Sequence, residues 1–199
     1  KVLFELVEAA MEFGVKEMSA YAFSTENWKR SPEEVKFLMG YSRESLRNRR
    51  DRLHELGVKV QWVGRPQRLW KSVIEELQEA EELTAKNKKF TLNMCVNYGG
   101  RAEIIDAAAE LARDVKRGKV KADSITEKTF EKYLYSPKMS DVDLFLRSSG
   151  EQRTSNFLPW QATYAELVFM DVLWPDMTPA QLWKAIEEYS CRDRRFGKA

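Results

Sequence analysis

Two arginines and a serine follow a short apolar run in the last third of the chain. The run, Val142 to Leu146, has the length and composition of a buried strand. Arg147 follows it directly, and Arg153 and Ser155 come a few residues later. Ligands of open α/β sheets bind at the carboxyl ends of strands, and arginine forks match phosphate oxygens two at a time. The stretch predicts a diphosphate site; a loop held by pairing of the arginines with Glu151 or an aspartate is the alternative.

Two further polar segments also follow apolar runs of strand length. The first, Ser24 to Arg30, combines hydroxyls, a carboxylate, an amide, an indole and a guanidinium. The second, Asn97 to Arg101, contains the pair Gly99-Gly100, which would let the backbone approach an anion at a helix N-terminus. It lacks the spacing of a dinucleotide fingerprint or a P-loop, and such a pair is more often only a tight turn.

Glu166 stands among apolar residues directly before the strand-like run Leu167 to Met170. An unpaired carboxylate in such surroundings is costly. The position therefore predicts a neighbouring cation, which is either a lysine or arginine side chain or a metal ion.

Strands alternate with helices along the whole sequence. This order predicts an α/β fold with a parallel-stranded central sheet flanked by helices on both faces, in a single domain over residues 1–199. The longest expected helix runs from Pro32 to Leu56, with Ser31 as its N-cap. Its apolar stripe would form one wall of an apolar tunnel, or would simply be core. The other expected elements are strands at 18–23, 58–64 and 90–96 and helices at 2–13, 68–86, 100–116, 126–134 and 178–190.

Composition excludes several classes of protein. The 199 residues are 43% hydrophobic and 32% charged with a formal net charge of +2, so no strong field favours nucleic acid or an anionic membrane. No 18-residue apolar run is present, and no signal peptide is expected. Cys95, inside an apolar run, and Cys191 make no disulfide framework, which favours a reducing cytosol. The one histidine, His54, excludes a zinc site of several histidines.

The helix expected at 32–56 carries a run of arginines. A solvated helix face is the usual meaning of such a run, and an RNA-binding face is the sharper alternative. Acidic residues interrupt the run, which favours the first interpretation. The arginines are Arg43, Arg47, Arg49, Arg50 and Arg52.

Four blocks in register resemble the cis-prenyltransferases, the undecaprenyl/decaprenyl diphosphate synthase family. They are Ser24-Thr25-Glu26-Asn27-Trp28-Lys29-Arg30, Asn97-Tyr98-Gly99-Gly100-Arg101, Arg147-Ser148-Ser149-Gly150-Glu151 with Arg153-Thr154-Ser155-Asn156-Phe157, and Tyr164-Ala165-Glu166-Leu167. The likeness covers essentially the whole chain and is nearest to the actinobacterial decaprenyl diphosphate synthases.

The resemblance implies a Mg²⁺-dependent condensation of isopentenyl diphosphate with a farnesyl-like allylic diphosphate, repeated with cis geometry to make a decaprenyl-like carrier for cell-wall synthesis. Asn27 matches the residue assigned to accept the proton lost from isopentenyl diphosphate. As a neutral amide is a poor base, Asn27 would relay or position that proton. Glu166 matches a Mg²⁺ ligand.

The remaining matches concern substrate and partner. Positions lining the substrate site are matched by Ser24, Thr25, Glu26, Trp28 and Arg30, and the isopentenyl diphosphate cradle by Arg147, Arg153, Thr154 and Ser155. Arg195 and Gly197 are similar to a tail that reaches into the partner subunit's site, which implies a homodimer. A cytoplasmic enzyme is expected, with peripheral contact at the inner face of the plasma membrane for product release.

One departure lies at the front of the chain. The family carries, before its first helix, a strand ending in an Asp-Gly-Asn-Gly-Arg-Trp loop that supplies the Mg²⁺ aspartate and the allylic cradle. This motif is not in the sequence, which opens at Lys1 in a helical pattern, so an N-terminally incomplete domain is expected. A smaller departure is Gln152, where many members have histidine.

Two rival functions remain at this point. A non-catalytic partner subunit of the same family would not need to keep Asn27, Arg30, Arg147, Arg153 and Glu166 together. An RNA-binding module is disfavoured by the near-neutral charge.

Overall fold

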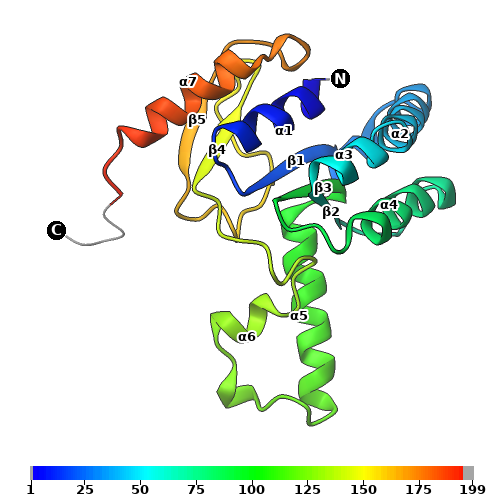
Figure 1. The fold of residues 1–199 in the computed structure, drawn as a ribbon. Coiled ribbons are helices and arrows are strands. Elements are labelled where there is room, and N and C mark those ends of the chain that lie inside the picture. The colour runs from blue at the N-terminus through cyan, green and yellow to red at the C-terminus, as the bar shows by residue number, and fades with distance from the viewer. Residues whose placement is uncertain (1, 195–199) are drawn as a thin grey trace.

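A computed structural model describes residues 2–194, in which helices and strands alternate as expected (Figure 1). The strands are β1 Glu17–Ser24, β2 Val58–Val63, β3 Phe90–Tyr98, β4 Leu144–Arg147 and β5 Glu166–Phe169. The α-helices are α1 Val2–Glu12, α2 Pro32–Arg47, α3 Arg50–Leu56, α4 Lys71–Thr84, α5 Gly100–Lys116, α6 Glu127–Glu131 and α7 Pro179–Ser190. Short 3₁₀ helices are η1 Thr25–Lys29, η2 Ala122–Ser124 and η3 Trp174–Asp176.

Every strand pair in the described residues is parallel, which confirms the predicted α/β fold. The strands fall into two sheets, one in the order β1-β3-β2 and one formed by β4 and β5. Because the pairs are parallel, the carboxyl ends of β1, β2 and β3 share one edge, and Arg147 ends β4 opposite Phe169 of β5. Loops that follow these ends can therefore meet.

Side chains on the two faces of β3 enter different hydrophobic cores. Leu92, Met94 and Val96 belong to a large core that also takes buried residues from α1, α2, α3, α4 and α7. Cys95 and Tyr98 belong to a smaller core that includes Leu158. For residues 92 to 96 this division follows from the period of two along a strand, whereas Tyr98 leaves that period because the register shifts at Asn97, which has a positive φ of 54°. The two cores confirm that both faces of the sheet are covered.

The prediction of a single helix from Pro32 to Leu56 is wrong, because α2 ends at Arg47 and a second helix, α3, begins at Arg50. Asn48 caps α2, and Arg49 leaves helical geometry at φ −126°. This stretch has several adjacent arginines and no apolar side chain to hold a straight helix on the core. The predicted end of the second helix is confirmed, since Gly57 has the left-handed φ of 81°.

The arginine run is only partly the solvated face that was predicted. Glu76 of α4 is 3% exposed, and both Arg47 and Arg50 pair with it, Arg47 at 2.5 Å and Arg50 at 3.1 Å. Arg50 also pairs with Glu79. These bridges join the end of α2 and the start of α3 to α4, so the two arginines neutralise a buried carboxylate.

Other boundaries move by a few residues. The helix expected from Arg68 begins at Lys71, because Arg68 has a positive φ of 69°. α6 is a short helix capped by Thr126, and β4 begins two residues later than predicted.

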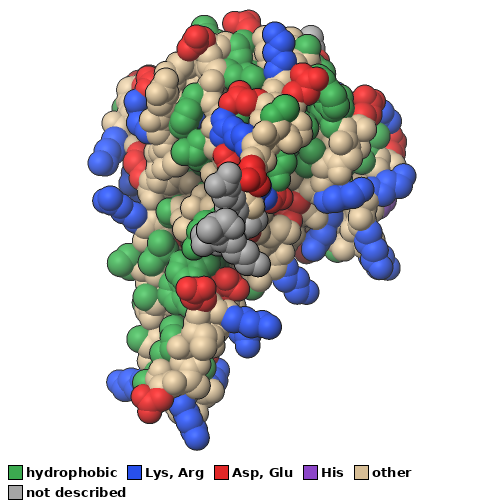
Figure 2. All heavy atoms as spheres, turned by 90° about the vertical axis from the view of Figure 1, so that its left-hand side faces the viewer, with side chains coloured by type: hydrophobic (Ala, Val, Ile, Leu, Met, Phe, Trp, Pro, Cys, Tyr) green, Lys and Arg blue, Asp and Glu red, His purple; other side chains and the backbone are tan. Residues whose placement is uncertain are grey.

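The surface matches the small net charge. On the face shown in Figure 2, acidic and basic side chains are scattered among one another, and α5 and α6 form an extension below the body of the molecule. Among the described helices, none combines the length and apolar character that crossing a membrane requires. Cys95 is buried, as expected, and Cys191 is exposed.

Candidate functional site

Arg147 holds the loop that follows β4. Its Nη1 donates to the carbonyl oxygen of Arg153 at 2.6 Å and to Ser155 Oγ at 2.7 Å, so the predicted trio lies together. Arg153 pairs with Glu151 and is 61% exposed. The alternative, a loop held by an ion pair between an arginine and Glu151, is thus also partly correct. The two interpretations are compatible, because an exposed ion pair of this kind is weak and Arg153 can exchange Glu151 for an anion.

The same loop has an unusual backbone. Ser149, Ser155, Asn156 and Leu158 have φ values of 73°, 49°, 64° and 47°, in the left-handed region that non-glycine residues seldom adopt. The loop is held against the chain after β5 by Ser149 N–H donating to Val172 O and Gly150 N–H to Met170 O, at 2.8 and 2.9 Å. Such backbone conformations gather at functional sites, where surrounding structure enforces them.

The segment after β1 is a tight 3₁₀ turn. Asn27 and Ser24 form a capping box: Ser24 N–H donates to Asn27 Oδ1 at 2.8 Å, and Asn27 N–H donates to Ser24 Oγ at 3.2 Å. Arg30 ends the segment, exposed and 3.7 Å from Glu34. The oxygen of the Asn27 amide is therefore committed to the backbone, and its NH₂ group is the part that can meet a ligand.

Asn156 ties the loop after β4 to the loops after β1 and β3. Its Nδ2 donates to Glu26 Oε1 at 2.9 Å, its Oδ1 accepts from Arg101 N–H at 2.8 Å, and its carbonyl oxygen accepts from Gly100 N–H at 2.8 Å. The N-terminal amides of α5 at Gly100 and Arg101 are thus occupied by Asn156, so the anion suggested there does not have them. The glycine pair instead permits close packing, since a Cβ on Gly99 would lie 2.2 Å from Thr25 Oγ1.

A cavity of about 360 Å³ opens where these loops meet. Glu26 and Thr154, two of the predicted substrate residues, line it together with Arg101. Burial by itself would raise the pKa of Glu26, but hydrogen bonds from Asn156, its own backbone N–H, Ser24 and Thr25 together lower it. Glu26 is accordingly an anion that holds the loops together.

A buried carboxylate lies in the first turn of α5. Glu103 is fully buried, and it accepts from Tyr98 Oη at 2.7 Å and from Tyr135 N–H at 3.1 Å. Burial raises its pKa, against the effect of these hydrogen bonds. Its role is to fix the end of β3 against α5 and residue 135.

Trp28 completes the set at this edge of the sheet. Its Nε1 donates to Asn97 Oδ1 at 2.7 Å, and the Arg68 guanidinium lies 4.5 Å from its ring centroid. Asn97 and Asn156 both lie within the sequence motifs, but the sequence alone assigned neither of them a role. The available signal was an asparagine directly after a predicted strand or turn, where left-handed φ is tolerated.

Glu166 lies away from this cluster. It begins β5 opposite Leu144, three residues before Arg147 along β4, a separation of roughly 10 Å along the strand. Its predicted cation is Arg192, whose Nη1 lies 2.9 Å from Glu166 Oε2. Among residues 2–194, no group of three or more acidic, histidine or cysteine side chains is placed to hold a metal ion. Arg195 and Gly197 lie outside the described residues.

Comparisons with known proteins agree with this architecture. The family model of undecaprenyl diphosphate synthases matches residues 1–197. A (2Z,6E)-farnesyl diphosphate specific trans,polycis-polyprenyl diphosphate synthase of Thermobifida fusca is 64% identical over 197 residues, 99% of this chain and 70% of the relative. The decaprenyl diphosphate synthase of Mycobacterium tuberculosis is 57% identical over 198 residues, 100% of this chain and 67% of the relative.

Solved structures share the fold. A lavandulyl diphosphate synthase from Lavandula x intermedia, in complex with dimethylallyl diphosphate, has a TM-score of 0.94 at 34% identity, covering 98% of this chain and 84% of its own. A probable undecaprenyl diphosphate synthase from Campylobacter jejuni has a TM-score of 0.87 at 34% identity, with 99% and 90% covered. The chain belongs to the undecaprenyl diphosphate synthase family. It is a cis-prenyltransferase of the polyprenyl diphosphate synthase type.

Proposed function

We propose that the protein condenses isopentenyl diphosphate with a farnesyl-like allylic diphosphate and repeats the step to a decaprenyl-like product that serves cell-wall lipid carrier synthesis. The observation that carries the proposal is the cluster of Arg147, Arg153 and Ser155 after β4. Two guanidiniums and a hydroxyl suit a diphosphate, because arginine forks match phosphate oxygens two at a time. The cradle would hold the isopentenyl diphosphate, with Thr154 and Ser155 as hydroxyl donors.

Asn27 would act as a donor in this site. Because Ser24 N–H holds its oxygen, the NH₂ group is left to bind a diphosphate oxygen or to orient the substrate from which the proton is lost. A neutral amide is a poor base, so we propose that Asn27 positions the substrate and that the proton passes to the diphosphate released from the allylic substrate.

The growing product is apolar and requires an apolar sleeve. Phe37 and Tyr41 on α2 stack at a centroid distance of 6.2 Å while 69% and 54% exposed. Apolar surface left outside the core in this way suits a tunnel wall beside α2 and α3. We propose this as the tunnel side of the molecule.

The assembly and location follow the family resemblance. We propose a homodimer in which Arg195 and Gly197 reach the partner subunit's site. We also propose a cytoplasmic location with peripheral contact at the inner face of the plasma membrane, where a long polyprenyl product partitions.

Mg²⁺ is the proposed cofactor, and the residues present fit it only in part. When bound, it would neutralise diphosphate charge. Glu166 is the one described residue that the resemblance assigns to it, and its carboxylate would first have to leave Arg192. The aspartate loop that the resemblance assigns to the metal does not occur among residues 1–199.

Arg153→Ala should weaken isopentenyl diphosphate binding. Loss of charge-assisted hydrogen bonds costs about 1.5–3 kcal/mol, so the KM for this substrate should rise roughly 10- to 150-fold. The matched control is Glu151→Gln, which releases Arg153 from its ion pair and should leave the KM unchanged or lower. An unchanged KM in Arg153→Ala would remove Arg153 from the cradle.

Glu166→Gln should raise the Mg²⁺ concentration needed for half-maximal activity several-fold, since a neutral amide is a weaker ligand for a hard cation. Arg192→Gln is the control, because it removes the ion-pair partner and keeps the carboxylate. If Glu166 binds Mg²⁺, only the first variant shifts the Mg²⁺ titration upward. Equal shifts in both would show that Glu166 has a structural role alone.

The proposed function is tested with the full-length protein, radiolabelled isopentenyl diphosphate, farnesyl diphosphate and Mg²⁺. The extracted lipids should form a ladder that ends near ten isoprene units. Absence of incorporation with every allylic primer tried would indicate a non-catalytic partner subunit.

A further inference from the structure

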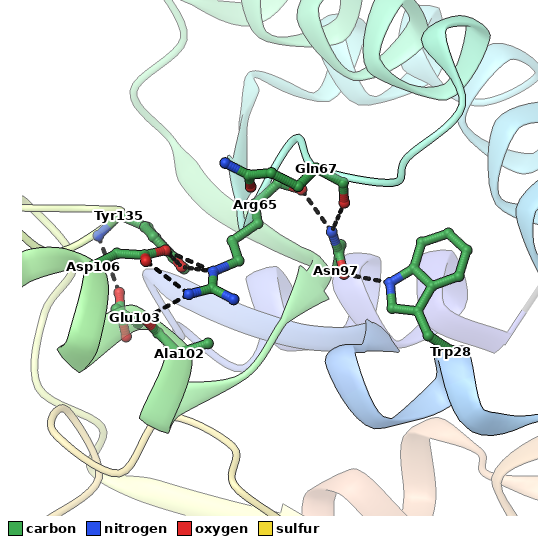
Figure 3. Close-up of polar contacts among 8 residues, drawn as sticks. All are labelled: Trp28, Arg65, Gln67, Asn97, Ala102, Glu103, Asp106 and Tyr135. Carbon is green, nitrogen blue, oxygen red and sulfur yellow. Dashed lines mark hydrogen bonds and ion pairs between the residues drawn. The ribbon is translucent and has the colours of Figure 1, made fainter.

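Asn97, at the end of β3, contacts the two other segments that form this part of the site (Figure 3). Its Nδ2 donates to the carbonyl oxygens of Arg65 and Gln67 at 2.9 and 2.7 Å, and its Oδ1 accepts from Trp28 Nε1 at 2.7 Å. The side chain is only 2% exposed. One buried amide therefore joins the end of β3 to the segments that follow β1 and β2.

The orientation of this amide is fixed by chemistry. Both Nδ2 hydrogens go to carbonyl oxygens, which can only accept, so the Oδ1 must face the indole N–H. The backbone is held as well, since the Asn97 carbonyl oxygen accepts from Arg65 N–H at 3.1 Å. Its φ of 54° lies in the left-handed region, which asparagine and glycine tolerate.

The segment that Asn97 holds is itself anchored. The Arg65 guanidinium makes a fork with Asp106 on α5, Nε to Oδ2 at 2.6 Å and Nη2 to Oδ1 at 2.7 Å, and its Nε also donates to Tyr135 Oη at 2.9 Å (Figure 3). Asn97 thus presents its acceptor to Trp28 from a rigid base. Mobility of the loop after β2 cannot change that direction without breaking the fork.

The Trp28 ring also contacts Arg68 and Phe23, and neither contact sets its rotation as a hydrogen bond does. Arg68 lies over its face at 4.5 Å, and the Phe23 ring meets it edge-on at 5.0 Å and 71°. Ring contacts of this kind accept a range of tilts. The bond to Asn97 is the directional contact.

We infer that Asn97 is a positioning residue for prenyl transfer, which fixes the Trp28 indole beside Asn27 in the substrate site. The inference rests on the proposed function, because Trp28 and Asn27 have a substrate only if that proposal holds. It assigns a role to Asn97 in the reaction, in addition to its place in the fold.

The variants Asn97→Gly and Asn97→Asp separate two roles of Asn97, which are positioning of the Trp28 indole and support of the loop after β2. Both residues tolerate the left-handed backbone. Glycine loses both donations to Arg65 and Gln67, and aspartate keeps at most one, from a protonated carboxyl, because its second oxygen faces those two carbonyl oxygens in a buried site. Both variants should therefore be less stable than the wild type. Aspartate retains an oxygen acceptor for Trp28, whereas glycine has none. We expect kcat/KM for isopentenyl diphosphate to fall about tenfold or more in Asn97→Gly, the size of one lost hydrogen bond, and to recover most of this loss in Asn97→Asp.

The first readout is independent of activity. In a ¹⁵N–¹H spectrum the Trp28 indole signal, identified by its loss in Trp28→Phe, should keep its position in Asn97→Asp and move upfield in Asn97→Gly. The second is a double-mutant cycle: in a Trp28→Phe background, Asn97→Gly should lower kcat/KM by less than about twofold more.

Equal losses of kcat/KM in the two Asn97 variants, or an indole signal unmoved in Asn97→Gly, would overturn the inference and leave Asn97 as a loop clamp. Failure of the proposed function would be seen separately, as an inactive wild-type protein. In that case the indole shift would still report whether Asn97 orients Trp28.

Discussion

Replacing Arg147 by alanine should lower kcat/KM for isopentenyl diphosphate about a thousandfold, which corresponds to about 4 kcal/mol of lost transition-state stabilisation. The loss exceeds that expected for Arg153 because Arg147 acts twice. It supplies positive charge at the end of β4, and its Nη1 holds the carbonyl oxygen of Arg153 and the hydroxyl of Ser155. Without Arg147, the cradle loses one of its two guanidiniums. It also loses the hydrogen bonds that position Arg153 and Ser155.

Two variants separate these roles of Arg147. Ser155→Ala removes one of the loop contacts and no charge, so it should cost about tenfold or less. Arg147→Lys keeps the charge but loses the planar fork, so its kcat/KM should lie between those of Ser155→Ala and Arg147→Ala. Steady-state kinetics of the full-length protein provide the measurement. If Arg147→Ala kept wild-type kcat and KM, the diphosphate site would lie elsewhere.

Local patterns in the sequence predicted the elements and the loop that we propose to bind the diphosphate. The strand before Arg147, the N-cap at Ser31 and the alternation of strands with helices each depend on a few neighbouring residues, and the structure confirms them. The four motif blocks were likewise visible without the fold. What they could not provide is which loops meet in space.

The contacts that organise the site are long-range in sequence. Glu26 and Asn156 are 130 residues apart, and Trp28 and Asn97 are 69 apart, so no periodicity or spacing records either pair. The same holds for Arg192 beside Glu166, where burial predicted a cation but could not choose between an arginine and a metal. The false helix from Pro32 to Leu56 has a related cause, because the break at residues 48 and 49 accompanies bridges from Arg47 and Arg50 to the distant Glu76.

Gly100→Ala should destabilise the protein by about 3 kcal/mol, at the upper end of overpacking substitutions, and lower its melting temperature by roughly 6–12 °C. Gly100 is buried at the start of α5, and a Cβ there would lie 2.0 Å from Pro159 Cδ and 2.3 Å from Cγ. A proline ring cannot rotate aside. The chain beside it is also constrained, because Leu158 is 1% exposed and already has a positive φ of 47°.

The shift of Pro159 that a Cβ on Gly100 forces would also affect the candidate site. Gly100 N–H donates to the carbonyl oxygen of Asn156, and a shift of residues 156–159 would break this bond and the contact of Asn156 with Glu26. We therefore expect activity at 25 °C to fall together with stability. Gly40→Ala is the matched control: it lies within α2, no atom other than its chain neighbours and the backbone of its own helix lies within 4 Å of the added Cβ, and the substitution should stabilise by about 0.5–1 kcal/mol. Urea unfolding of both variants provides the comparison, and a Gly100→Ala protein as stable as wild type would show that α5 and Pro159 are not in the close contact described.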